Sequence, residues 1–93
     1  MIRSFKCDET ENIWNGKISK RFPIEIQKIG RRKLRMMNNS QSLFDLRIPP
    51  SNRLEALKGK RKGQYSIRIN NQWRICFKWS NGDCDNVEIT DYH

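Results

Sequence analysis

The sequence lacks a long apolar run and any pattern typical of secretion. No apolar stretch approaches the roughly 20 residues of a membrane-spanning helix, and the N-terminus has no apolar signal-peptide core. These absences predict a cytoplasmic protein that does not bind a membrane. A chain of 93 residues can bury one core, so we expect a single domain over residues 1–93.

Cysteine and histidine are also scarce. Cys7, Cys76 and Cys84 are odd in number and form no C-x-x-C pair, which argues against a disulfide framework. His93 is the only histidine and cannot complete a zinc site. The C-terminal carboxylates alternate between the faces of an expected strand and do not converge on magnesium; they are Asp83, Asp85, Glu88 and Asp91. We expect reduced thiols, no metal and no cofactor.

Acidic residues are few relative to basic ones. The chain has 19 Lys and Arg against 10 Asp and Glu, a formal charge of +9. An anionic partner, nucleic acid first, would offset this self-repulsion. Residues 17–35 contain eight basic residues and one acid, Glu25, whereas residues 81–93 contain four acids and no Lys or Arg. The basic surface is therefore expected to be a patch.

Residues 1–16 predict a short strand and a short helix. Ile2 and Phe5 precede a break in the apolar pattern. The segment Asp8–Glu11 then places a cap residue three positions before a carboxylate, as in a capping box. We expect an edge strand at residues 1–6 and a helix ending at Gly16.

A second helix is predicted from Pro23, its first residue, to the polar residues 38–40. One face is apolar and most basic residues lie off it. The apolar residues are Ile26, Ile29, Leu34 and Met37; the basic ones are Lys28, Arg31, Arg32 and Arg35. Gly30 lies within the apolar stripe and predicts close packing against a neighbouring element.

The second half of the chain predicts an antiparallel meander. Pro49 and Pro50 make residues 41–52 a connector with at most one short turn, around 43–46. Apolar and polar residues then alternate at 65–69 and 73–79, which predicts two half-buried strands. Turns at 70–72 and 80–82 lead to a last strand at 84–89. The fold class is α+β, with two N-terminal helices packed on a small, mainly antiparallel sheet.

The register of this meander predicts a cationic face. A three-residue loop at 70–72 keeps the apolar side chains together by setting Ile69 opposite Trp73. Arg68 then lies opposite Arg74 on the other face, a like-charge pair that an anion between them would stabilise.

The second hairpin adds polar groups to the same face. A three-residue loop at 80–82 would set Glu88 opposite Arg74 and bring Tyr92 to the arginine face. The alternative is a solvated polar face with a surface salt bridge of little energetic value.

A glycine-flanked basic loop precedes these strands. Residues 57–63 carry Lys58, Lys60, Arg61 and Lys62, which can offer cations and backbone N–H donors to a phosphate. The arginine face and three candidate proton carriers, Lys58, Tyr92 and His93, predict RNA cleavage without metal, by attack of the RNA's own 2′-hydroxyl.

The most distinctive motifs lie between Leu54 and His93. They are Leu57-Lys58-Gly59, the run from Gly63 to Asn70, Gln72-Trp73-Arg74-Ile75 and Asp91-Tyr92-His93. With the opening Met1–Phe5, they resemble the HigB killer proteins of the RelE/ParE toxin superfamily over nearly the whole chain. The resemblance implies a microbial-RNase-like fold and a ribosome-dependent endoribonuclease that cuts mRNA in the ribosomal A site.

The same resemblance implies roles for individual residues. Lys58, Arg74 and Tyr92 match catalytic positions of HigB-like toxins, and Asp91 and His93 match adjoining positions. Arg68 is the second arginine by the face argument. Some relatives carry a histidine where Glu55 stands, so the role of general base is open between His93 and Lys58. Tyr92 could stack on an mRNA base, orient the 2′-hydroxyl or act as an acid toward the leaving 5′-oxygen; stacking ranks first because it depends least on the protonation of the phenol.

Partners and alternatives complete the prediction. The resemblance implies a HigA-type antitoxin, mRNA and the 70S ribosome as partners, with operator DNA contacted only through the antitoxin. We expect RNA or ribosome contacts at Lys28, Arg31, Arg32, Arg35, Lys60, Arg61 and Lys62. One alternative is a ParE-like toxin that inhibits DNA gyrase without cutting RNA. Another is a non-catalytic nucleic-acid-binding module that uses the basic helix face.

Overall fold

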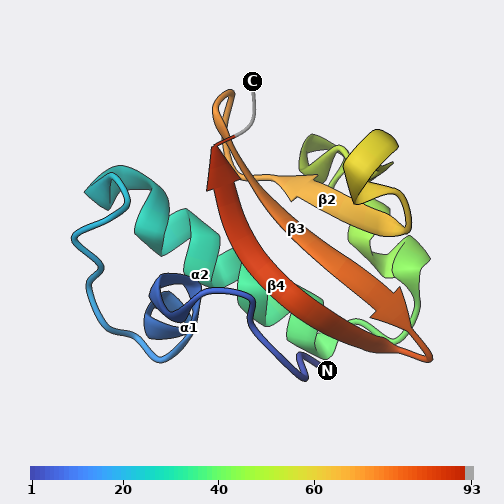
Figure 1. The fold of residues 1–93 in the computed structure, drawn as a ribbon, viewed down its shortest axis with the longest axis horizontal. Helices are drawn as coiled ribbons and strands as arrows, with labels where there is room; N and C mark the ends of the chain where they lie inside the picture. The colour runs from blue at the N-terminus through green and yellow to red at the C-terminus, as the bar shows by residue number, and fades with distance from the viewer. Residues whose placement is uncertain (92–93) are drawn as a thin grey trace.

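The computed structural model describes residues 1–91 and places two helices against one four-stranded antiparallel sheet (Figure 1). The helices are α1 (Asp8–Trp14) and α2 (Ile24–Asn39). The strands are β1 (Glu55–Ala56), β2 (Gln64–Arg68), β3 (Trp73–Ser80) and β4 (Asp83–Asp91), and they follow one another across the sheet in chain order. The predicted α+β class and meander are confirmed.

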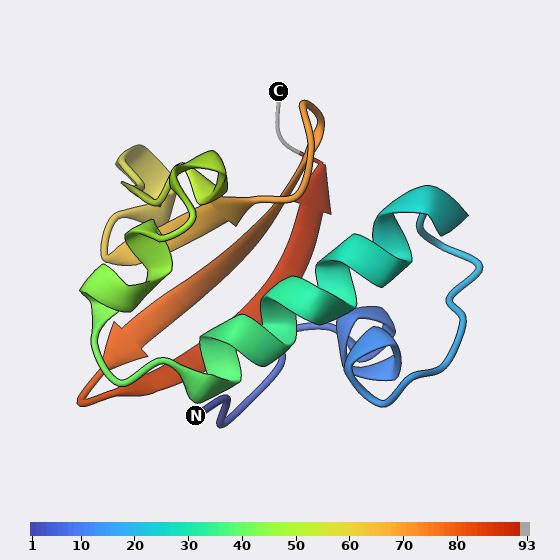
Figure 2. The ribbon, with the colours of Figure 1, turned by 180° about the vertical axis from the view of Figure 1, so that it is seen from behind.

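The core lies between α2 and the sheet, which the helix crosses (Figure 2). Ile26, Leu34 and Met37 are buried on α2, as the apolar stripe predicts. A Cβ atom on Gly30 would lie 3.5 Å from Cδ1 of both Ile69 and Ile89. Close packing at Gly30 is therefore confirmed: the helix approaches the sheet at the one residue without a side chain.

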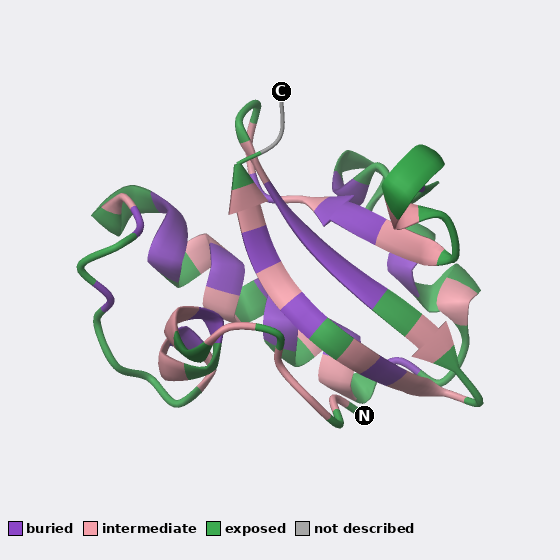
Figure 3. Ribbon diagram, in the orientation of Figure 1, coloured by how far each residue is buried: buried purple, intermediate pink, exposed green. Residues whose placement is uncertain are grey.

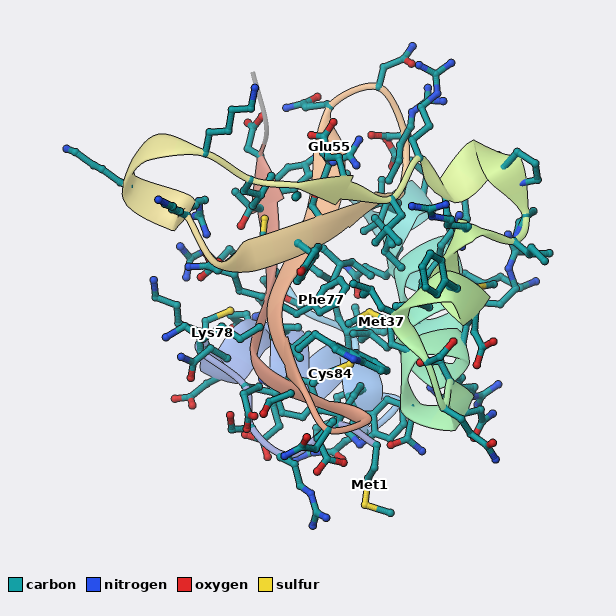
Figure 4. The ribbon with its side chains drawn as sticks, turned by 90° about the vertical axis from the view of Figure 1, so that its right-hand side faces the viewer. Met1, Met37, Glu55, Phe77, Lys78 and Cys84 are labelled. Carbon is teal, nitrogen blue, oxygen red and sulfur yellow. The ribbon has the colours of Figure 1, made fainter. Side chains whose placement is uncertain are left out.

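The central strand β3 is more buried than expected. Phe77 lies toward Met37 and α2, whereas Lys78 lies on the other side of the sheet (Figure 4). The prediction of a half-buried strand fails in the first half of β3, where Arg74 and Cys76 are buried as well (Figure 3). The cause is the segment before β2, which contacts this second face and removes it from water.

The N-terminal predictions need correction. Residues 1–6 form two isolated parallel bridges to β4, from Ile2 to Cys84 and from Phe5 to Val87, and no strand of their own. Cys7 caps α1 without a side-chain hydrogen bond, so the predicted capping box is wrong. Thr10 is buried and its Oγ1 accepts a hydrogen bond from the Ile89 N–H at 3.0 Å, which anchors α1 to β4.

Helix α2 begins one residue later than predicted, because Pro23 is its cap and Ile24 its first residue. The connector also holds more structure than predicted. It contains two 3₁₀ helices, η1 (Leu43–Arg47) and η2 (Pro50–Asn52), and a third, η3 (Gly59–Arg61), lies in the basic loop. Within residues 1–91, no helix has the length and apolar character needed to cross a membrane.

The register of β3 with β4 differs from the prediction. Arg74 lies opposite Thr90, and Glu88 lies opposite Cys76. The turn has two residues, since Ser80 pairs with Asp83, and it is followed by a bulge between Cys76 and Lys78. The bulge adds a residue on β4, where Asn86 has a φ of 52°. Turn and bulge together keep Val87 and Ile89 in the core and shift the partner of Glu88 by two residues along β3, from Arg74 to Cys76.

Candidate active site on the second face of the sheet

Arg74 is the centre of the face that points away from α2. Its Nε donates to Ser66 Oγ at 2.7 Å, and one terminal nitrogen donates to the Arg53 carbonyl at 2.6 Å and to the Ser66 carbonyl at 3.3 Å. Arg74 is 8% exposed and Ser66 is fully buried. These contacts fix the guanidinium in one orientation.

Arg68 and Glu55 lie beside this fixed cation. Arg68 pairs with Arg74 across β2 and β3, as predicted, and its side chain donates to Asn71 Oδ1. Glu55 pairs with Ser66 across β1 and β2, which brings Glu55 Oε1 to 3.9 Å from Arg74 Nε. Two guanidinium groups and a carboxylate thus share one face of three adjacent strands.

The basic loop folds back over the same face. Arg61 of η3 forms an ion pair of 2.8 Å with Glu88 on β4 and donates to Gln64 Oε1 at 3.2 Å. Glu88, predicted to face Arg74, holds the loop instead. Cys76 is buried beneath; loss of solvent raises the pKa of its thiol, and the nearby Arg61 guanidinium opposes that shift only in part.

Comparisons with known proteins point to one family of toxins. The family model of the RelE-like toxin HigB, from type II toxin–antitoxin systems, matches residues 3–93. The chain belongs to this family. Toxin HigB-1 of Vibrio cholerae serotype O1 is 44% identical over 83 residues, which is 88% of this chain and 87% of that protein. Endoribonuclease HigB of Proteus vulgaris is 30% identical over 94 residues and all of both chains.

Two solved structures share the fold of this chain. YafQ from E. coli strain BL21(DE3) has a TM-score of 0.61 at 12% identity and covers 98% of this chain and 91% of its own. The YoeB-YefM complex from Staphylococcus aureus gives a TM-score of 0.63 at 18% identity, covering 100% of this chain and 95% of that chain. At these identities the likeness extends to the fold alone.

The other predicted site residues lie at the margins of the face. Lys58 caps η3 and is exposed, as are Lys60 and Lys62 in the same loop. Asp91 ends β4, and one of its carboxylate oxygens accepts a hydrogen bond of 3.0 Å from Gln72. Tyr92 and His93, predicted as proton carriers, lie outside the described residues.

The structure also adds residues that the sequence patterns did not single out, since Ser66 and the Arg53 carbonyl hold Arg74. Glu55, noted from the sequence only as the position of a histidine in some relatives, is the carboxylate beside Arg74. Position 66 alternates with apolar neighbours and looks like an ordinary polar strand position. Ser66 could have been identified only from the face it lies on and from its pairing with Glu55. That pairing requires β1, a strand of only two residues.

A buried lysine lies beneath the face. Lys33 of α2 is 6% exposed, and its ammonium donates to Asn52 Oδ1. Asn52 in turn donates to the Leu46 carbonyl at 3.2 Å. Burial lowers the pKa of Lys33, and the positive charges of Arg32 and Arg68 lower it further. Lys33 thus belongs to the interior, although the charge count placed it in the basic patch.

Proposed function

We propose that this chain is an endoribonuclease toxin that cleaves mRNA in the A site of the translating ribosome. The observation that carries the proposal is the buried Arg74, fixed by Ser66 and the Arg53 carbonyl beside Arg68. A phosphate between the two guanidinium groups would offset their mutual repulsion. The relative from Proteus vulgaris, named Endoribonuclease HigB, supports the activity.

The two arginines are suited to the transition state more than to the bound RNA. Attack on a phosphodiester gives a pentacovalent phosphorane that carries more negative charge than the starting diester. Arg74 is already oriented, so it needs little rearrangement as that charge develops. Arg68, less buried, supplies the second positive charge.

We assign the general base to Glu55, whose side chain is 46% exposed beside Arg74. Its carboxylate takes the proton of the 2′-hydroxyl, the 2′-oxygen bonds to phosphorus, and the bond from phosphorus to the 5′-oxygen breaks. The leaving oxygen takes a proton from Lys58, Tyr92 or His93. The products are a 2′,3′-cyclic phosphate and a 5′-hydroxyl, and the step requires no metal ion.

The remaining cations serve docking. Lys60 and Lys62 are exposed at the rim of the face, where they can contact ribosomal RNA. Asp91 is held by Gln72 at the end of β4, next to Tyr92, which stacks on an mRNA base. Action on ribosomes places the protein in the cytoplasm, and a HigA-type antitoxin that also binds the operator DNA neutralises it.

The test combines translating ribosomes with a modified mRNA. Purified protein is added to a translation mixture, and mRNA 5′ ends are mapped with and without a 2′-O-methyl group at the scissile nucleotide. We expect cleavage of ribosome-bound mRNA, little cleavage of naked mRNA, 5′-hydroxyl ends, and loss of cleavage on 2′-O-methylation. Cleavage that survives 2′-O-methylation would rule out attack by the 2′-hydroxyl.

The same preparation separates the alternatives. Gyrase supercoiling is assayed in parallel, with Arg74→Ala and Tyr92→Phe as variants. Intact mRNA together with inhibited gyrase would replace the proposal with a ParE-like activity. Intact mRNA, active gyrase and tight RNA binding would instead indicate a non-catalytic binding module.

A further inference from the structure

A groove of about 630 Å³ lies on the helix side of the molecule, between α2 and the segment that follows α1. That segment arches away from α1 and returns at the start of α2 (Figure 2). Five basic residues line the groove: Lys17, Lys28, Arg31, Arg32 and Arg35. No Asp or Glu is among its described lining residues. The groove and the Arg74 face lie on opposite sides of the sheet, because α2 packs on Ile69 and Ile89, whose side chains point away from Arg74.

The five cations of this groove lack compensation inside the protein. Among residues 1–91, none of them forms an ion pair or a side-chain hydrogen bond. The Nε atom of Arg31 is buried and has no partner in the described chain. Its guanidinium lies over Gly16, where a Cβ atom would come within 3.1 Å of Nη2. An external anion is the remaining source of neutralisation.

The apolar part of the groove indicates which class of anionic ligand fits it. Ile18 is 75% exposed on its rim, and Ile13 and Ile29 complete the apolar lining. No aromatic side chain is among the groove's lining residues within 1–91, and these residues offer no stacking surface for a base. A nucleic-acid backbone gains nothing from exposed isoleucine, whereas a peptide can place an apolar side chain there and its carboxylates on the arginines.

We propose that this groove binds an acidic peptide segment of the partner antitoxin that carries at least one branched apolar side chain. Its carboxylates pair with Arg31, Arg32 and Arg35, and its apolar side chain packs against Ile18 and Ile29. Only the identity of the partner rests on the proposed function. The recognition itself does not depend on RNA cleavage.

The test measures binding of three labelled probes to the full chain by fluorescence anisotropy. The first is an acidic peptide with leucines at helical spacing, the second has serine in place of each leucine at equal charge, and the third is a single-stranded RNA of equal charge. We expect the leucine peptide to bind at least about tenfold more tightly than the serine peptide, since burial of apolar side chains adds to the charge attraction.

Three variants locate the binding. The double variant Arg32→Glu with Arg35→Glu should lower the affinity for the leucine peptide by about a hundredfold. Ile18→Ser should lower that affinity by about fivefold. The matched control is Lys6→Glu with Lys78→Glu, two exposed lysines away from the groove, with the same change in net charge. Circular dichroism checks that each variant folds.

The outcomes are distinct. A groove effect that exceeds the control supports the proposal, as does the preference for the leucine peptide. Equal affinity for the two peptides, or equal losses of affinity in the groove and control variants, would contradict the proposal. The groove would then attract anions only through its general positive charge. A larger loss for RNA than for peptide would make it a nucleic-acid surface. Cleavage on ribosomes is measured separately, so either proposal can fail alone.

Discussion

The two cationic regions of this molecule differ in how their charges are held. On the second face of the sheet, Arg74, Arg68 and Arg61 each have polar partners within the chain that orient them. Along the groove beside α2, the five cations have no such partners among residues 1–91. Fixed cations suit a reaction, because the cost of ordering them is met on folding. Unpaired cations suit association, where the partner supplies the counter-charge.

Loss of the arginine fork should give the largest effect. In Arg74→Lys the charge remains, but one ammonium cannot hold Ser66 and the Arg53 carbonyl while also meeting a phosphate. We expect cleavage on ribosomes to fall by about a thousandfold. The matched control is Arg3→Lys, an exposed arginine paired with Asp83. Equal rates in the two variants, at equal folded fraction, would show that Arg74 is structural.

Removal of the proposed base should give the next largest effect. Glu55→Gln keeps the size of the side chain but cannot take up the 2′-hydroxyl proton, so we expect the cleavage rate to fall by about a hundredfold. Glu55→Asp should retain more activity than Glu55→Gln. Equal cleavage rates in Glu55→Gln and the wild type, at equal folded fraction, would assign the base to Lys58 or His93.

Variants at Ser66 test whether the orientation of the Arg74 guanidinium contributes to cleavage, separately from its charge. Ser66→Ala leaves the Arg74 Nε without its hydroxyl acceptor, and we expect kcat to fall by about tenfold with KM nearly unchanged. Ser66→Thr keeps the hydroxyl and should recover part of the loss. Thermal unfolding gives the stability of each variant. A rise in KM with constant kcat would mean that Ser66 serves RNA binding and not the orientation of Arg74.

The faces of β2, β3 and β4 could be predicted from the sequence, but the strand β1 and the register of β4 could not. Arg68 and Arg74 pair as predicted, since a period of two and a common apolar face allow few alternatives. The turn was missed although Asn81-Gly82 is a strong signal for a two-residue hairpin, with φ values of 52° and 83°. That turn alone would have put Val87 on the arginine face. The bulge on β4 restores Val87 to the core side, and its only signal in the sequence is Asn86, a residue type that tolerates a positive φ.

Contacts between distant segments were beyond the sequence patterns. The Arg61–Glu88 pair joins η3 to β4, and the Arg74–Arg53 contact joins β3 to the residue after η2. Both contacts depend on how the segment before β2 folds over the sheet. Neither the positions of the prolines nor the number of basic residues specifies the path of that segment. The helix groove was half predicted: its cations were visible in residues 28–35, but the exposed Ile18 and the absence of partners were not.

Lys33 sharpens the comparison within α2 itself, because this cation is held internally while its neighbours line the groove. Burial, Arg32 and Arg68 lower its pKa below the ordinary 10.5. Between the lowered pKa and 10.5 the unfolded chain binds more protons, so this residue's contribution to the free energy of unfolding rises as pH increases and levels off above 10.5.

Urea unfolding of the wild type and Lys33→Met at several alkaline pH values measures this contribution, since other titrating groups cancel in the difference. We expect the stability of the wild type relative to Lys33→Met to increase with pH. This effect should be smaller than those expected for the variants at Arg74, Glu55 and Ser66. A difference that is constant with pH would mean that the Asn52 hydrogen bond offsets the desolvation of the ammonium, and a difference that decreases with pH would mean that the bond outweighs it. Lys33 would then be a stabilising cation, and the interior would favour its charged form.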